Sequence, residues 1–208
     1  AAARTVAVDT GHTPQRPGAR GPGGGEEYRF NLALSTRLAE QLASRGYTVL
    51  RIAADGQPIE LKERTAKAAG ADLFVSIHHD SIQQAWIDEG RRREFSGYAV
   101  FVSGKNPDLP SSLRCAKRIG EQLGAAGEHA SLYHATPITG ENRPLLDAPN
   151  GVHSFDDLIV LKTATMPAVL IEAGVIANPE EEIRLGESAT QAMLARAIAD
   201  GVVHCLKP

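Results

Sequence analysis

Hydrophobic positions in the first eighty residues follow two different spacings. Short apolar runs typical of buried strands occur at TVAVDTGH (5–12), YTVLRI (47–52) and DLFVSIHH (72–79). Between the first two runs, apolar residues recur every fourth position from Phe30 to Leu42, which predicts an amphipathic helix that ends near Gly46. Residues 59–70 are predicted to form a second helix. The resulting order of strand, helix, strand, helix, strand predicts parallel strands joined by crossover helices.

The second half of the chain continues this pattern. Further strands are predicted at GYAVFVSG (97–104), DLIVLK (157–162) and AVLIEAG (168–174), and further helices at 110–126, from NPEEEIRL (178–185) and from Met193 to Leu206. Residues 14–25 and 127–157 are predicted loops, and the polar residues 82–95 suit a loop or a surface helix. Because no repeat or linker is visible, we predict one α/β domain over residues 1–208, with a mostly parallel, six-stranded twisted sheet and helices on both faces.

Composition narrows the possible functions. With 208 residues, 42% of them hydrophobic, the chain can bury a sizeable core. The formal net charge of −3 argues against a broad nucleic-acid surface, and no apolar run is long enough to span a bilayer. The first residues, AAARTVAVDT, have neither a basic n-region nor an apolar h-region, so we expect a signal peptide to be absent or already removed.

Two cysteines, Cys115 and Cys205, lie outside any C-x-x-C pair, so we expect no cysteine-based zinc site. Two interpretations stay open. We favour two free thiols packed on helices. The alternative is one disulfide that pins the C-terminal helix to the body, which would imply an oxidising compartment.

Polar residues gather where the predicted strands end. In open α/β sheets, ligands bind beyond the carboxyl ends of the strands. Two imidazoles and a carboxylate at that edge could bind zinc and leave a position for water, and another carboxylate could act as general base. Each residue alone has an ordinary structural explanation, such as a first-turn carboxylate favoured by the helix dipole. The residues in question are Asp9, His12, His78, His79, Asp80 and Glu172 at strand ends, and Glu26 and Glu27 at the start of the first helix.

Four motifs give this arrangement a family resemblance. They are VDTGH with its glycine-rich loop, EEYRFNLALSTRLAEQL, ADLFVSIHHDS and PAVLIEAGVIANPEEE. In this order they resemble the zinc-dependent N-acetylmuramoyl-L-alanine amidases, cell-wall hydrolases with a single α/β domain. The resemblance runs from about residue 4 to residue 205 and is weakest between 82 and 157. It implies one Zn²⁺ ion held by His12, Glu27 and His78, with Glu172 as the catalytic residue.

The two adjacent histidines of the third strand, His78 and His79, are expected to have different roles. Alternation on a strand places Phe74, Ser76 and His78 on one face and His79 on the other. The motif selects His78 as the ligand, so we expect His79 to pack or to hydrogen-bond.

Other polar residues receive weaker expectations. Asp9 could hydrogen-bond a ligand histidine or cap its strand, and we expect Arg64 to be a structural ion-pair partner. Three histidines in predicted loops, His129, His134 and His153, are expected to be solvated. Among them, His153 is the best candidate for contact with a substrate.

The chain also departs from the family pattern outside the proposed ligands. Thr13-Pro14 replace two glycines, Asp80 replaces an asparagine, Arg51-Ile52 replace a threonine-arginine pair, and PNGVHSF lacks an arginine. Some relatives insert a long inhibitory helix before the last two strands, and no clear equivalent is visible. We therefore expect an open site, or one controlled by a shorter loop in residues 127–157.

The resemblance implies hydrolysis of the amide bond between the lactyl group of N-acetylmuramic acid and L-alanine of the stem peptide, in cell-wall remodelling or cell separation. Peptidoglycan is the expected partner, with an activator protein as a further one, and the substrate implies a periplasmic or extracellular location. Alternatives are a zinc peptidase acting within the stem peptide and a catalytically silent wall-binding relative. A nucleotide site at GARGPGGGEE is disfavoured, because the Walker lysine is missing and Glu26 and Glu27 would repel phosphate.

Overall fold

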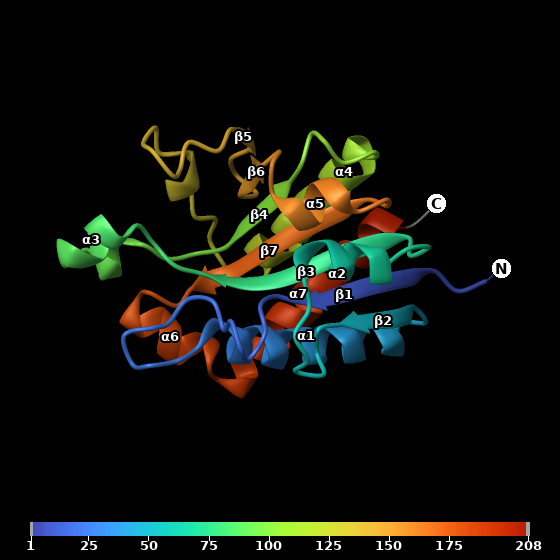
Figure 1. Cartoon of the computed structure of the whole chain (residues 1–208), viewed down its shortest axis with the longest axis horizontal. Coiled ribbons are helices and arrows are strands. Elements are labelled where there is room, and N and C mark those ends of the chain that lie inside the picture. Colours follow the sequence, from blue (N-terminus) through green and yellow to red (C-terminus); the bar gives the residue numbers. More distant parts are fainter. Residues whose placement is uncertain (1, 207–208) are drawn as a thin grey trace.

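The computed structural model describes residues 2–206. Its strands form one seven-stranded sheet in the order β2-β1-β3-β7-β4-β6-β5 (Figure 1). The strands are β1 (Thr5–Thr10), β2 (Thr48–Ile52), β3 (Leu73–Asp80), β4 (Ala99–Val102), β5 (Leu145–Asp147), β6 (Val152–Ser154) and β7 (Ala168–Val175). β2, β1, β3 and β7 are parallel, β4 runs antiparallel to β7, and β6 is parallel to β4. The predicted α/β class with a mostly parallel sheet is confirmed, with seven strands in place of six.

Helices cover both faces of the sheet. Three of them pack on the face that contains Val75 and Ile77 of β3, and two shorter ones pack on the face that contains Phe74 (Figure 1). The first group is α1 (Glu27–Ser44), α4 (Leu109–Ala125) and α7 (Ser188–Leu206), and the second is α2 (Leu61–Lys67) and α5 (Ile159–Thr163). Peripheral helices are α3 (Gln84–Asp88), α6 (Pro179–Leu185) and the 3₁₀ turns η1 (Arg92–Glu94) and η2 (Tyr133–Ala135). No helix within residues 2–206 combines the length and apolar character needed to cross a membrane.

The segment DLIVLK is the main correction to the predicted elements. Residues Ile159–Thr163 form α5, and Val160 and Leu161 are buried against the sheet. A run of four apolar residues suits a buried strand and a buried helix turn equally, so periodicity cannot separate them. Residues 127–157, predicted as loop throughout, contain η2 and the short strands β5 and β6.

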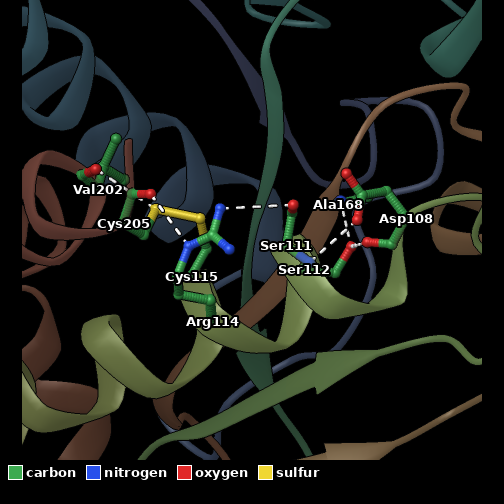
Figure 2. Close-up of a disulfide and its surroundings, with 8 residues drawn as sticks. All are labelled: Asp108, Ser111, Ser112, Arg114, Cys115, Ala168, Val202 and Cys205. Atoms are coloured by element: carbon green, nitrogen blue, oxygen red, sulfur yellow. Dashed lines mark hydrogen bonds between the residues drawn. A yellow bond between two sulfur atoms is a disulfide. The ribbon is translucent and has the colours of Figure 1, made fainter. Parts of the chain in front are cut away.

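A disulfide joins Cys115 of α4 to Cys205 of α7, with the two Cα atoms 4.9 Å apart (Figure 2). The favoured interpretation of two free thiols is therefore wrong, and the alternative is confirmed. The two helices approach closely near this point. A Cβ atom at Gly201 would lie only 2.5 Å from the Cα of Ile119, so only glycine allows this approach. Arg114 adds a hydrogen bond from its Nε to the backbone oxygen of Cys205 at 3.3 Å (Figure 2). The C-terminal helix is thus held to the body covalently.

Candidate metal centre and catalytic site

Three side chains from separate elements converge at the carboxyl edge of the parallel strands. Glu27, the first residue of α1, places Oε2 3.1 Å from Nε2 of His12 and 3.0 Å from Nδ1 of His78. One ligand atom of each of the three residues lies within 4.8 Å of the others. Two imidazole nitrogens and one carboxylate oxygen form a donor set that suits catalytic zinc, which keeps a further position open. The three residues fit such an ion.

The backbone at His12 adopts an unusual conformation that is held by a buried ion pair. His12 has φ 65°, in the left-handed region that few non-glycine residues occupy. Arg64 donates from Nη2 to the His12 carbonyl at 2.7 Å and from Nη1 to Asp9 at 2.8 Å. Both charged side chains are buried, which confirms the structural ion-pair role expected for Arg64. This ion pair fixes the turn that presents the His12 imidazole.

Asp9 reaches the candidate ligand His78 through a serine. The hydroxyl of Ser76 donates to Asp9 Oδ2 at 2.7 Å and lies 3.1 Å from Nε2 of His78. Since the hydroxyl proton points to Asp9, the Ser76 oxygen accepts the Nε2 proton of His78. With a metal ion in place, this tautomer would leave a lone pair for the ion on Nδ1 of His78, on the side of Glu27; without one, a proton on Nδ1 hydrogen-bonds to Glu27. Asp9 thus neither hydrogen-bonds a ligand directly nor simply caps its strand.

Glu27 is oriented by a second chain of hydrogen bonds. Ala19 N donates to Oε1 at 3.1 Å, and Nδ2 of Asn31, one turn along α1, donates to Oε2 at 3.1 Å. The Oδ1 of Asn31 accepts from Nδ1 of His79 at 2.8 Å. Burial lowers the pKa of His79 to about 4, so this imidazole stays neutral. The expectation that His79 hydrogen-bonds is confirmed.

The charge state of Glu27 follows from these contacts. Burial alone would raise its pKa, but hydrogen bonds and charge interactions with His12 and His78 hold the pKa well below its usual range. Glu27 is therefore an anionic carboxylate, the form that ligates metals.

Glu172 is the neighbour of His78 across the β3–β7 pair and lines the same cavity. Its Oε2 is buried and has no hydrogen-bond partner among residues 2–206. Burial, and then the negative charges of Asp80 and Glu27, raise the pKa of Glu172 well above its usual value. An acid with a raised pKa and an unused oxygen in a cavity is suited to proton transfer.

Two cavities meet at the histidines of the candidate metal centre. A polar one of about 560 Å³ contains all three candidate ligands together with Glu172. A second, mostly apolar one of about 310 Å³ lies between β1, α2 and α5, and its lining includes Ile59, Leu61, Ile159 and Val160. His12 and His78 line both, so a molecule at the metal centre can extend in two directions.

His134 differs from its expected solvated state. It lies between two carboxylates, with Nδ1 2.8 Å from Glu141 Oε2 and Nε2 hydrogen-bonded to Asp80. Burial alone would lower its pKa, but Asp80 and Glu141 outweigh burial and raise the pKa to about 9. The expectation of a solvated side chain is therefore wrong for His134.

The other two loop histidines differ from each other. His153 is fully buried and its Nδ1 lies 2.9 Å from the Gly151 carbonyl oxygen, so the expectation of a solvated side chain is wrong here too. His153 is absent from the lining of both cavities, and no surface of it is open to a substrate. His129 is exposed, as expected, and hydrogen-bonds Ser96.

Several residues of the site were not singled out from the sequence. Local spacing could have identified two of them. Ser76 shares a strand face with His78, and Asn31 lies one helical turn after Glu27. Glu141 and Arg143 lie in an irregular segment where no periodicity predicts which side chains point inward.

Comparison with known proteins agrees with the family resemblance seen in the sequence motifs. A family model described as N-acetylmuramoyl-L-alanine amidase matches residues 6–204. The chain is 28% identical to the N-acetylmuramoyl-L-alanine amidase AmiA of Escherichia coli over 96% of its length and 75% of that protein. It is 27% identical to AmiC of Neisseria meningitidis over 95% of its length, and it spans only 51% of that relative.

A solved structure adds to this result. The CwlD amidase from Clostridioides difficile, determined in complex with the GerS lipoprotein, superposes with a TM-score of 0.75 at 25% identity. The match covers 98% of each chain.

Proposed function

Because the chain belongs to the N-acetylmuramoyl-L-alanine amidase family, we propose that it hydrolyses the amide bond between the lactyl group of N-acetylmuramic acid and L-alanine in peptidoglycan. One observation carries this proposal: the His12, Glu27 and His78 cluster and the unpartnered Glu172 carboxyl line one cavity. Amide hydrolysis needs a group that activates water and a group that returns a proton to the leaving nitrogen, and this cavity offers both.

We assign the metal site to His12, Glu27 and His78. A zinc ion bound there would lower the pKa of water and polarise a carbonyl group. The protein contributes the orientation of its donors. Ser76 fixes the tautomer of His78, and Asn31 directs a carboxylate oxygen of Glu27 toward both imidazoles.

Glu172 carries the proton in this mechanism. Its carboxylate takes a proton from the water that attacks the lactyl carbonyl carbon. When the carbon–nitrogen bond breaks, Glu172 returns that proton to the nitrogen of L-alanine. The products are a lactyl carboxylate on the sugar and a stem peptide with a free amino terminus. The raised pKa of Glu172 strengthens its carboxylate as a base.

Location and partners follow from the substrate and from one structural feature. Peptidoglycan lies outside the cytoplasm, so we propose a periplasmic or extracellular location. The Cys115–Cys205 disulfide supports this, because disulfides persist in oxidising compartments. The complex of the CwlD amidase with the GerS lipoprotein supports a protein activator as a further partner.

A digest of purified peptidoglycan, followed by mass spectrometry of the new ends, tests the proposal. We expect free amino-terminal L-alanine in the absence of chelator and none in its presence. A new peptide end within the stem would instead identify a peptidase that uses the same metal site. The absence of any product from zinc-loaded protein would identify a wall-binding protein.

A further inference from the structure

Arg143 is a cation that lines the polar cavity alongside four acidic side chains and several histidines. Among residues 2–206, it is the only lysine or arginine that lines the polar cavity, and no carboxylate lies within ion-pair distance of it. Three of the four acids of this cavity already contact histidines, and the fourth, Glu172, is assigned to proton transfer. Glu27 contacts the two ligand imidazoles, and Asp80 and Glu141 both contact His134.

The structure holds this guanidinium in a defined position. Its central carbon lies 3.6 Å from the centre of the Phe155 ring, which also lines the cavity. The backbone N–H of Arg143 donates to the His134 carbonyl at 2.7 Å, so the residue is tied to the Asp80–His134–Glu141 cluster. A guanidinium stacked on an aromatic ring keeps its N–H donors free at the edge, where they can bind a carboxylate in bidentate fashion.

The chemistry of the substrate shows which ligand would supply that carboxylate. The muramic acid side of the scissile bond has no free carboxyl, because its lactyl carboxyl forms the amide. The stem peptide does have free carboxyls, on its γ-linked D-glutamate and at its C-terminus. The two cavities that meet at His12 and His78 show a matching difference: the polar one has the cation Arg143 to receive a carboxylate, and the other is mostly apolar.

We propose that Arg143 binds a free carboxylate of the stem peptide and thereby directs the peptide into the polar cavity, with the sugar toward the apolar one. This inference rests on the proposed amidase function. It makes Arg143 a residue that determines specificity: a stem whose carboxylate is amidated loses the bidentate contact and is cleaved more slowly.

The test uses soluble muramoyl tripeptides with the sequence L-alanine, γ-linked D-glutamate, L-lysine. Three substrates are compared: the parent, the form with the glutamate α-carboxyl amidated, and the form with the C-terminal carboxyl amidated. For the wild-type enzyme we expect kcat/KM to fall about tenfold to a hundredfold for one of the amidated forms, the size of a hydrogen bond to a charged group. Which form is affected identifies the carboxylate. Equal turnover of all three would overturn the inference and leave the amidase function intact, whereas cleavage of none would remove the function itself.

Two variants separate recognition from packing. Arg143→Gln should lower kcat/KM for the parent tripeptide to the value that the wild type shows for the slowly cleaved amidated form. The same variant should leave kcat/KM for that amidated form unchanged. Arg143→Lys should restore part of the preference for the parent over the amidated form. Arg16→Gln removes an exposed cation from the edge of the apolar cavity and should keep the wild-type preference. Equal loss on all substrates with Arg143→Gln would reduce Arg143 to a packing residue. Loss of the preference with Arg16→Gln would reverse the proposed orientation and overturn it.

Discussion

The Oγ of Ser76 lies 3.1 Å from Nε2 of His78, the imidazole nitrogen that does not face Glu27. Ser76 is anchored in turn by Asp9, which is buried and paired with Arg64. The candidate metal site is thus continuous with a buried ion pair that also fixes the turn at His12. Two of the three candidate ligands, His12 and His78, are oriented by this one ion pair and the residues bonded to it.

Removal of this link should weaken metal binding and leave the ligands in place. We expect Ser76→Ala to reduce zinc affinity about tenfold to a hundredfold, since partners of ligand imidazoles have effects of this size. Competition with a chromophoric chelator measures the dissociation constant. Ser103→Ala is a matched control, because Ser103 is also buried and donates to a backbone oxygen of Asp156, away from the site. Equal affinity in the two variants would contradict the role assigned to Ser76.

Glu172→Gln should separate chemistry from metal binding. The amide keeps the shape of the side chain but cannot take up the proton of the attacking water, so kcat should fall about 10²- to 10⁴-fold. Zinc content, measured by elemental analysis, should stay unchanged. Because the buried carboxyl has an oxygen without a hydrogen-bond partner in the described part of the chain, the free energy of unfolding should not decrease. Glu187→Gln, at an exposed position, is the control. Wild-type turnover by Glu172→Gln would exclude the proton-carrying role.

Sequence alone predicted the parts of the fold that depend on local periodicity. Val75 and Ile77 lie on the face opposite to Phe74, as the alternation of β3 predicts, because side-chain direction on a strand follows from the backbone alone. The same alternation predicted opposite directions for His78 and His79, and the family motif then selected His78 as the candidate ligand.

The features that the sequence did not predict depend on tertiary packing. The helical state of α5 is one, since its apolar run is too short to show a period. The disulfide is another, because its formation depends on the close approach of two helices at Gly201. The position of His134 between Asp80 and Glu141 is a third, because it lies in an irregular segment and its partners come from two places in the chain.

The disulfide should stabilise the protein substantially. It joins residues 90 positions apart, and native disulfides typically contribute about 2–4 kcal/mol to the free energy of unfolding, with long loops at the upper end. We therefore expect the double variant Cys115→Ser/Cys205→Ser to lose an amount of this size in urea denaturation. Reductant should destabilise the wild type similarly and leave the double variant unaffected. Insensitivity of the wild type to a reductant that demonstrably frees both thiols would contradict this prediction.

The pH dependence of stability should report the charge on His134. Its pKa rises from 6.5 to about 9 on folding, so the native state binds this proton more tightly than the unfolded chain does. The resulting stabilisation, about 3 kcal/mol at most, is fully present below pH 6.5 and is lost as the pH rises through 9. In urea denaturation, the wild type should exceed His134→Gln in stability at pH 6, and the difference should shrink by pH 9.5. His129→Gln, at an exposed position, should show no such trend. A wild-type advantage that is constant or grows with pH would contradict a charged His134 between Asp80 and Glu141.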